Sequence, residues 1–232
     1  MLDYLIIGSG LAGIAFAETA IQNNKTVLVV ANDSQNSSKI AAGLYNPVIL
    51  KRFSQVSDAE EQLLLLQLFY RAIEEKLNVK INFRIPILRK FFSIEEQNDW
   101  FAASDKVKLA PFLSLDLVSK VYEGIDSPFG YGEVLQTGFV DTAVLLNHYK
   151  QYLMDNNVFL EETFEYDVLE LNDEFMEYKK IKARQIIFAE GFGMRANPYF
   201  NQLPLDGTKG ELFIIKAPGL NLDVIINTSL FI

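Results

Sequence analysis

Three glycines near the N-terminus have the spacing that a phosphate-binding turn needs. Gly8, Gly10 and Gly13 form the pattern G-x-G-x-x-G directly after the apolar run at residues 4–7. In such a turn the first glycine permits a sharp bend, the second lets a diphosphate approach the backbone, and the third allows tight packing of a helix. That helix directs its free N–H groups and positive dipole end at the phosphates. The predicted phosphate-binding residues are Gly8, Ser9, Gly10, Leu11, Ala12 and Gly13.

The residues around the motif supply the strand, turn and helix that make it specific for a dinucleotide. A helix rich in small residues is predicted after the glycines, and a second strand at residues 27–30. An acidic residue after the second strand binds a ribose hydroxyl in many such units. Here the strand is followed by Ala31, Asn32 and Asp33. Either Asn32 or Asp33 is therefore the candidate ribose contact.

Composition and charge limit the class of protein. The chain has 232 residues, of which half are hydrophobic, so it can bury the core of one large domain or two small ones. A formal net charge of −9 argues against nonspecific binding to nucleic acid and against attraction to an anionic membrane surface. The sequence has neither a stretch of about 18 apolar residues nor a signal-peptide pattern. We therefore expect a cytoplasmic protein that has no membrane partner.

The residue types that commonly bind metals or form nucleophilic triads are scarce. The chain contains no cysteine, which excludes disulfides, thiolate ligands and a cysteine nucleophile. His148 is the only histidine, and its predicted place is the surface of a helix. The sequence therefore predicts no metal site and gives no support for a Ser-His-Asp arrangement.

The order of the predicted elements indicates an α/β fold with two domains. Residues 1–80 and 139–202 are predicted to form a discontinuous, Rossmann-like nucleotide-binding domain with a central parallel sheet and ββα layers. In residues 81–138 and 203–232, short apolar pieces alternate with turns, which is typical of an antiparallel sheet. These residues are expected to form a second, incomplete α+β domain that binds the substrate.

Local patterns predict the main helices and strands. A capping-box pattern at residues 57–60 predicts the start of a helix that runs to about Leu77. Asp141 is a candidate N-cap for a helix at 142–155, and residues 37–47 have the composition of a loop. Further strands are expected at 158–162, 166–171, 182–188, 210–216 and 222–226.

Four segments resemble, in order, the FAD-dependent oxidoreductases of the D-amino acid oxidase and glycine oxidase superfamily. They are residues 7–13, 41–47, 137–142 and 186–191, and the likeness covers nearly all of the chain. The resemblance implies FAD as the cofactor, with its pyrophosphate over the glycine turn. It further implies that Ser37 and Ser38 contact the phosphates and that Ala42, Gly43 and Leu44 line the flavin ring. The backbone at Val168 would hold the adenine. Ala189 and Gly191 would lie along the remaining edge of the cofactor.

The resemblance also implies an activity, the oxidation of a C–N bond in a small amine or amino acid. The amine would lose a hydride to the flavin, the imine would hydrolyse, and oxygen or another acceptor would reoxidise the flavin. Members of the superfamily continue well past the position that matches Ile232. That further part normally supplies an arginine for the substrate carboxylate and a glycine-rich segment over the flavin. The resemblance therefore implies a truncated chain, for which we name no catalytic residue.

Two other functions stay open at the level of the sequence. A related oxidoreductase domain in bacteria acts on a modified tRNA base, and a flavin domain of that kind is one alternative. The acidic charge weighs against a lone RNA-binding protein, though not against one that a partner assists. The other alternative is a nucleotide-binding module without catalysis, or an inactive fragment. The substrate, the electron acceptor and the oligomeric state do not follow from the sequence.

Overall fold

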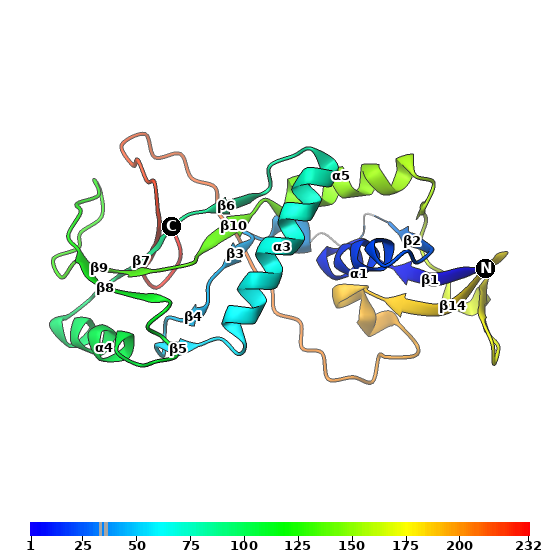
Figure 1. Cartoon of the computed structure of the whole chain (residues 1–232), viewed down its shortest axis with the longest axis horizontal. Coiled ribbons are helices and arrows are strands. Elements are labelled where there is room, and N and C mark those ends of the chain that lie inside the picture. The colour runs from blue at the N-terminus through cyan, green and yellow to red at the C-terminus, as the bar shows by residue number, and fades with distance from the viewer. Residues whose placement is uncertain (33, 35–36) are drawn as a thin grey trace. The chain divides into compact units, whose positions relative to one another are not determined.

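The structure, a computed structural model, describes residues 1–32, 34 and 37–232 and divides into two compact units. The first unit comprises Met1–Ala41 and Thr142–Leu212, and the second comprises Ala42–Asp141 and Phe213–Ile232 (Figure 1). Residues 42–80, expected in the nucleotide-binding domain, fall in the second unit. The reason is packing, because Val48, Leu50 and Leu63 lie in one buried cluster with residues of that unit such as Ile87 and Trp100. Within the same unit, strand β3 (Leu44–Tyr45) pairs with β10 (Gly138–Val140).

A six-stranded sheet forms the centre of the first unit. Its order is β11-β2-β1-β14-β13-β12, in which β11, β2, β1 and β14 run parallel, and β13 pairs antiparallel with both β14 and β12. The strands are β1 (Leu2–Ile7), β2 (Val27–Ala31), β11 (Phe159–Glu161), β12 (Leu169–Leu171), β13 (Met176–Tyr178) and β14 (Ile181–Phe188). From β1 the sheet extends to β2 on one side and to β14 on the other. Ligands of open α/β sheets bind at such a switch point, beyond the carboxyl ends of the strands.

Two long helices and an aromatic cluster cover this sheet. The helices of the unit are α1 (Leu11–Gln22), α2 (Ser37–Ile40), α5 (Thr142–Asp155) and the 3₁₀ segments η1 (Tyr166–Val168) and η2 (Gly191–Ala196). Leu5 and Ile7 of β1 pack in one buried cluster with Phe164 and Tyr178, whose rings stack with centroids 4.4 Å apart. Because side chains alternate along a strand, Leu5 and Ile7 point to the same side, and this cluster covers one face of β1.

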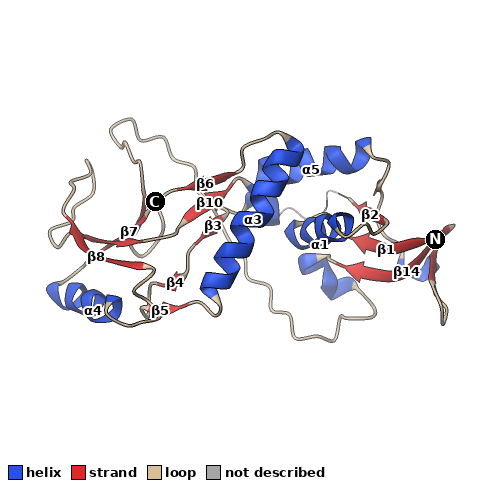
Figure 2. Ribbon diagram, in the orientation of Figure 1, coloured by secondary structure: helices blue, strands red, loops and turns tan. Residues whose placement is uncertain are grey.

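The second unit contains two main sheets and two helices (Figure 2). One sheet has the order β3-β10-β6, and the other has the order β15-β7-β9-β8. The further strands are β4 (Val48–Ile49), β5 (Ser54–Gln55), β6 (Asn82–Arg84), β7 (Ile87–Lys90), β8 (Leu113–Val118), β9 (Tyr131–Val134) and β15 (Ile225–Asn227). The helices are α3 (Ala59–Leu77) and α4 (Ile94–Ser104).

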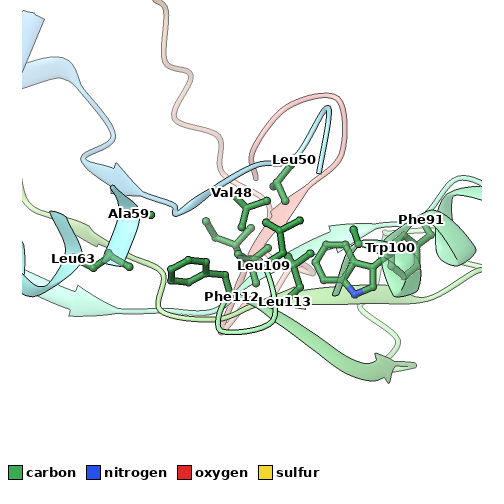
Figure 3. Packing of buried hydrophobic residues seen from close by; sticks show 12 residues of the cluster. Val48, Leu50, Ala59, Leu63, Phe91, Trp100, Leu109, Phe112 and Leu113 are labelled. Carbon is green, nitrogen blue, oxygen red and sulfur yellow. The ribbon is translucent and has the colours of Figure 1, made fainter. Parts of the chain in front are cut away.

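Trp100 belongs to the larger core of the second unit, where it lies beside Phe91 (Figure 3). Its side chain is fully buried, and its indole Nε1 donates a hydrogen bond to the carbonyl oxygen of Ser114 at 3.0 Å. The rings of Phe53 and Phe91 pack edge-on against it. Gly132 must lack a side chain, because a Cβ there would lie 2.3 Å from the indole ring.

Some elements differ from the sequence-based prediction. Residues 166–168 form η1, so the predicted strand at 166–171 is reduced to β12. Residues 37–40 are helical rather than loop, and the described residues 210–216 form no strand. A strand is stable only beside a partner, and the structure gives this apolar stretch none among the described residues. None of the helices in the described ranges is long and apolar enough to cross a membrane.

Candidate cofactor site

A cavity of about 360 Å³ lies in the first unit, at the carboxyl ends of its parallel strands. The lining comes from the turn after β1, the end of β2, helix α2, Leu146 of α5, the residues after β11 and the turn after β14. Among the lining residues are Gly8, Ser9, Gly10, Leu11, Ala12, Asn32, Ser37, Ser38, Glu162, Thr163, Phe164, Tyr166, Ala189, Glu190 and Gly191.

Gly8 and Gly13 lack side chains because the fold requires it. Gly8 has φ +105°, and a Cβ there would lie 2.4 Å from the carbonyl oxygen of Ala189. Backbone bonds fix this turn on both sides, from Gly8 N to Val30 O at 2.9 Å and from Ala189 N to Ile7 O at 2.7 Å. A Cβ on Gly13 would lie 2.0 Å from the carbonyl oxygen of Gly8, so this glycine lets α1 pack on the turn.

Gly10 is bare for a different reason. Its backbone is extended, with φ −72° and ψ −175°, a conformation that any residue adopts. A Cβ there would meet only Ser38 Oγ, at 3.4 Å, among the described atoms within 4 Å. The missing side chain therefore leaves space in the cavity rather than relieving a clash in the fold.

The N-terminus of α1 faces this space without a cap from the protein. Gly10 is the N-cap, and the first turn carries no acidic residue among its described positions. Leu11 and Ala12 line the cavity, and the first N–H groups of a helix have no acceptor within the helix. This end of α1 combines free donors, a positive dipole end and a bare approach, which together suit a phosphate.

The end of β2 carries an amide that is bonded to neighbouring residues. Asn32 Nδ2 donates to Thr163 Oγ1 at 2.8 Å. Asn32 Oδ1 accepts from the backbone N–H of Ser34 at 3.1 Å and from its hydroxyl at 2.5 Å. Asp33, the other predicted ribose contact, lies outside the described residues.

Two carboxylates that sequence reasoning missed also line the cavity. Glu190 accepts hydrogen bonds from the Tyr166 hydroxyl and, at 2.6 Å, from Nδ2 of the buried Asn197. Burial and the bond to Glu190 raise the pKa of Tyr166. Glu162 accepts a hydrogen bond from the Tyr178 hydroxyl at 2.6 Å, which lowers the pKa of Glu162. The sequence signal for both was their position at or just after the end of an expected strand, 158–162 for Glu162 and 182–188 for Glu190.

The structure brings most of the predicted cofactor residues together. The turn, the end of β2, α2 and the end of β14 all meet at the cavity, whereas Gly13 lies beneath it. Val168 lies in η1, 39% exposed and outside the lining, because the strand expected to position it is absent. Ala42, Gly43 and Leu44 belong to the second unit, so their contact with a flavin stays a prediction.

The chain is similar to known proteins in sequence and in structure. The sequence model of a family described as an FAD binding domain matches residues 3–63. The structure of glycine oxidase from Bacillus cereus is similar with a TM-score of 0.58 and 16% identity over 80% of this chain. L-amino acid deaminase from Proteus vulgaris is similar with a TM-score of 0.58 and 15% identity over 85% of this chain. Iminodiacetate oxidase from Chelativorans sp. BNC1 is similar with a TM-score of 0.58 and 13% identity over 80% of this chain.

The chain spans about half the length of these solved structures, covering 56%, 50% and 54% of them in the same order. At this level of identity the structural likeness concerns the fold. It confirms the predicted combination of a Rossmann-like domain with antiparallel sheets, and the family match confirms FAD as the cofactor. The chain is therefore an FAD-binding protein with the fold of the amino acid and amine oxidases that it resembles.

Proposed function

We propose that the chain is part of an FAD-dependent oxidoreductase that oxidises a C–N bond in a small amine or amino acid. The observation that carries the proposal is the cavity at the switch point, with a bare glycine turn and the uncapped start of α1. A second support is the likeness in fold to glycine oxidase, L-amino acid deaminase and iminodiacetate oxidase.

The chain's own residues would hold the cofactor by their backbone. The N–H groups of Leu11 and Ala12 would donate to the pyrophosphate, which approaches over Gly10. The hydroxyls of Ser37 and Ser38, at the edge of the same cavity, can donate to the phosphate oxygens. Bound FAD would supply the hydride acceptor, and the protein would supply placement and electrostatics.

The two units would have different functions, one in binding the cofactor and the other in binding the substrate. The first unit holds the whole lining of the cavity and would bind the adenosine and the pyrophosphate. The second unit carries residues 42–44, which would line the flavin, and its four-stranded sheet would form part of the substrate domain. The catalytic residues and the arginine for a substrate carboxylate are not assigned within the chain.

Anaerobic reduction of the bound flavin tests this function. The chain is saturated with FAD and mixed, without oxygen, with glycine, L-amino acids, D-amino acids and iminodiacetate in separate reactions. The proposal expects loss of the visible flavin absorbance with at least one of these compounds, followed by its return when air is admitted. Imine hydrolysis should release ammonia or a smaller amine in proportion. Bound FAD that no amine reduces would instead support a nucleotide-binding module without this catalysis.

A further inference from the structure

The position that usually carries a ribose-binding acid is occupied by an amide in this chain. Asn32 follows β2, where an acid commonly accepts a bond from the ribose. Its amide is already bonded within the protein, to Thr163 through Nδ2 and to Ser34 through Oδ1. These bonds fix Asn32 against the segment that follows β11.

A carboxylate stands at the same edge of the sheet, one strand away. Strand β11 pairs in parallel with β2, so that Glu161 lies opposite Ala31. The next residue, Glu162, donates its backbone N–H to Ala31 O at 3.2 Å. Glu162 therefore holds the position at the end of β11 that Asn32 holds at the end of β2, and both residues line the cavity.

Hydrogen bonds hold the Glu162 side chain in place, and its carboxylate can still accept one more hydrogen bond. Its Oε1 accepts from the hydroxyl of the buried Tyr178 at 2.6 Å and from Lys179 Nζ at 3.0 Å. Its Oε2 accepts from the same Nζ at 3.1 Å. Each carboxylate oxygen has two lone pairs, so Oε2 can take one more donor. The side chain is 25% exposed, which leaves it accessible to a ligand.

We propose that Glu162 accepts a hydrogen bond from a hydroxyl of the adenosine ribose, in place of an acid after β2. The inference rests on the proposed function in one respect only, that the cavity is the FAD site. Phe164 lines the same cavity and is packed on Tyr178, so the segment also offers an apolar surface beside the carboxylate. The assignment makes Glu162 a specificity residue for an adenosine whose ribose hydroxyls are free.

A cycle of ligand and protein changes tests the assignment. Dissociation constants are measured by calorimetry for ADP, 2′-deoxy-ADP and 3′-deoxy-ADP, first with the unmodified chain. One deoxy nucleotide should bind about tenfold more weakly than ADP, because a bond to a charged acceptor is lost. In Glu162→Ala, which removes the acceptor, the constants for ADP and for that deoxy nucleotide should become equal within about twofold.

Two variants serve as controls. Glu165→Gln removes a carboxylate from the same segment, which contacts Lys179 at 3.0 Å and lies outside the cavity lining. It should keep the tenfold preference for ADP. Asp33→Asn should keep it too, whereas loss of the preference in Asp33→Asn alone would transfer the role to Asp33. If Glu162→Ala does not fold, Glu162→Asp replaces it; its carboxylate stands on a side chain one methylene shorter, so the preference for ADP should fall well below tenfold.

Two outcomes overturn the assignment, and they are separable. Equal binding of ADP and both deoxy nucleotides by the unmodified chain contradicts it without any variant. A preference that survives in a folded Glu162→Ala contradicts it as well, while FAD binding and the proposed function stand. If the unmodified chain bound neither ADP nor FAD, the cofactor site itself would be wrong.

Discussion

Gly8 and Gly10 lie two residues apart, yet substitution of Gly10 should weaken FAD binding and substitution of Gly8 should destabilise the fold. Gly10→Ala places a methyl group in the cavity, in a backbone conformation that alanine adopts readily. Its free energy of unfolding should stay within about 0.5 kcal/mol of the unmodified chain, while its affinity for FAD falls at least tenfold, or about 1.4 kcal/mol. Thermal unfolding and FAD titration measure the two quantities separately.

Gly8→Ala should instead destabilise the fold. Alanine would have to adopt φ +105° and place its Cβ 2.4 Å from Ala189 O, which together should cost about 2 kcal/mol or more. Gly219→Ala is the control for a glycine in open space, since the nearest described atom to its Cβ is 4.0 Å away. Normal FAD binding by Gly10→Ala would contradict the role given to this turn.

At the level of single elements, Glu74 holds the turn between α3 and β6. Its Oε1 accepts from the backbone N–H of Ile81 at 2.9 Å and of Asn82 at 2.8 Å, and Lys80 Nζ lies 3.1 Å from Oε2. Burial alone would raise the pKa of Glu74, but these bonds and the Lys80 charge lower it overall, below its ordinary value of 4.5.

A lowered pKa in the folded state means that the ionised form stabilises the fold. The stabilisation by Glu74 should be complete above pH 4.5 and should be lost as the pH falls through the lower folded-state pKa. Urea unfolding as a function of pH should therefore show that Glu74→Gln is less stable than the unmodified chain at neutral pH. The difference should shrink in acid. Glu75→Gln, which removes an exposed pair with Arg71, should show little effect at either pH.

A buried hydrogen bond joins α1 to α5. The Tyr149 hydroxyl donates to Glu18 Oε2 at 2.7 Å, and both side chains are fully buried. Burial and the contact with Glu18 raise the pKa of Tyr149. Tyr149→Phe removes a donor from a buried carboxylate and should cost about 1–3 kcal/mol of unfolding free energy. Tyr4→Phe is the matched control, since the Tyr4 hydroxyl has no hydrogen bond to the described part of the chain; equal effects would contradict this account.

At the scale of the whole molecule, the local features were predictable from the sequence and the nonlocal ones were not. The glycine turn and helix α3 follow from short patterns, because their geometry depends on neighbours in the chain. That Glu162 and Glu190 line one cavity depends on which strands lie side by side, and strand order is not encoded locally. The same holds for residues 42–80, which belong to the second unit because Val48, Leu50 and Leu63 pack in its core. Residues 210–216 have the composition of a strand, but a strand also needs a partner.

Titration of the unmodified chain with FAD tests the central claim most directly. The account predicts saturable binding of one FAD per chain, measured by flavin fluorescence, and displacement of that FAD by ADP, because both ligands would place their diphosphate over the glycine turn. A folded chain that binds no FAD, or that binds FAD without competition from ADP, would contradict the assignment of the cavity.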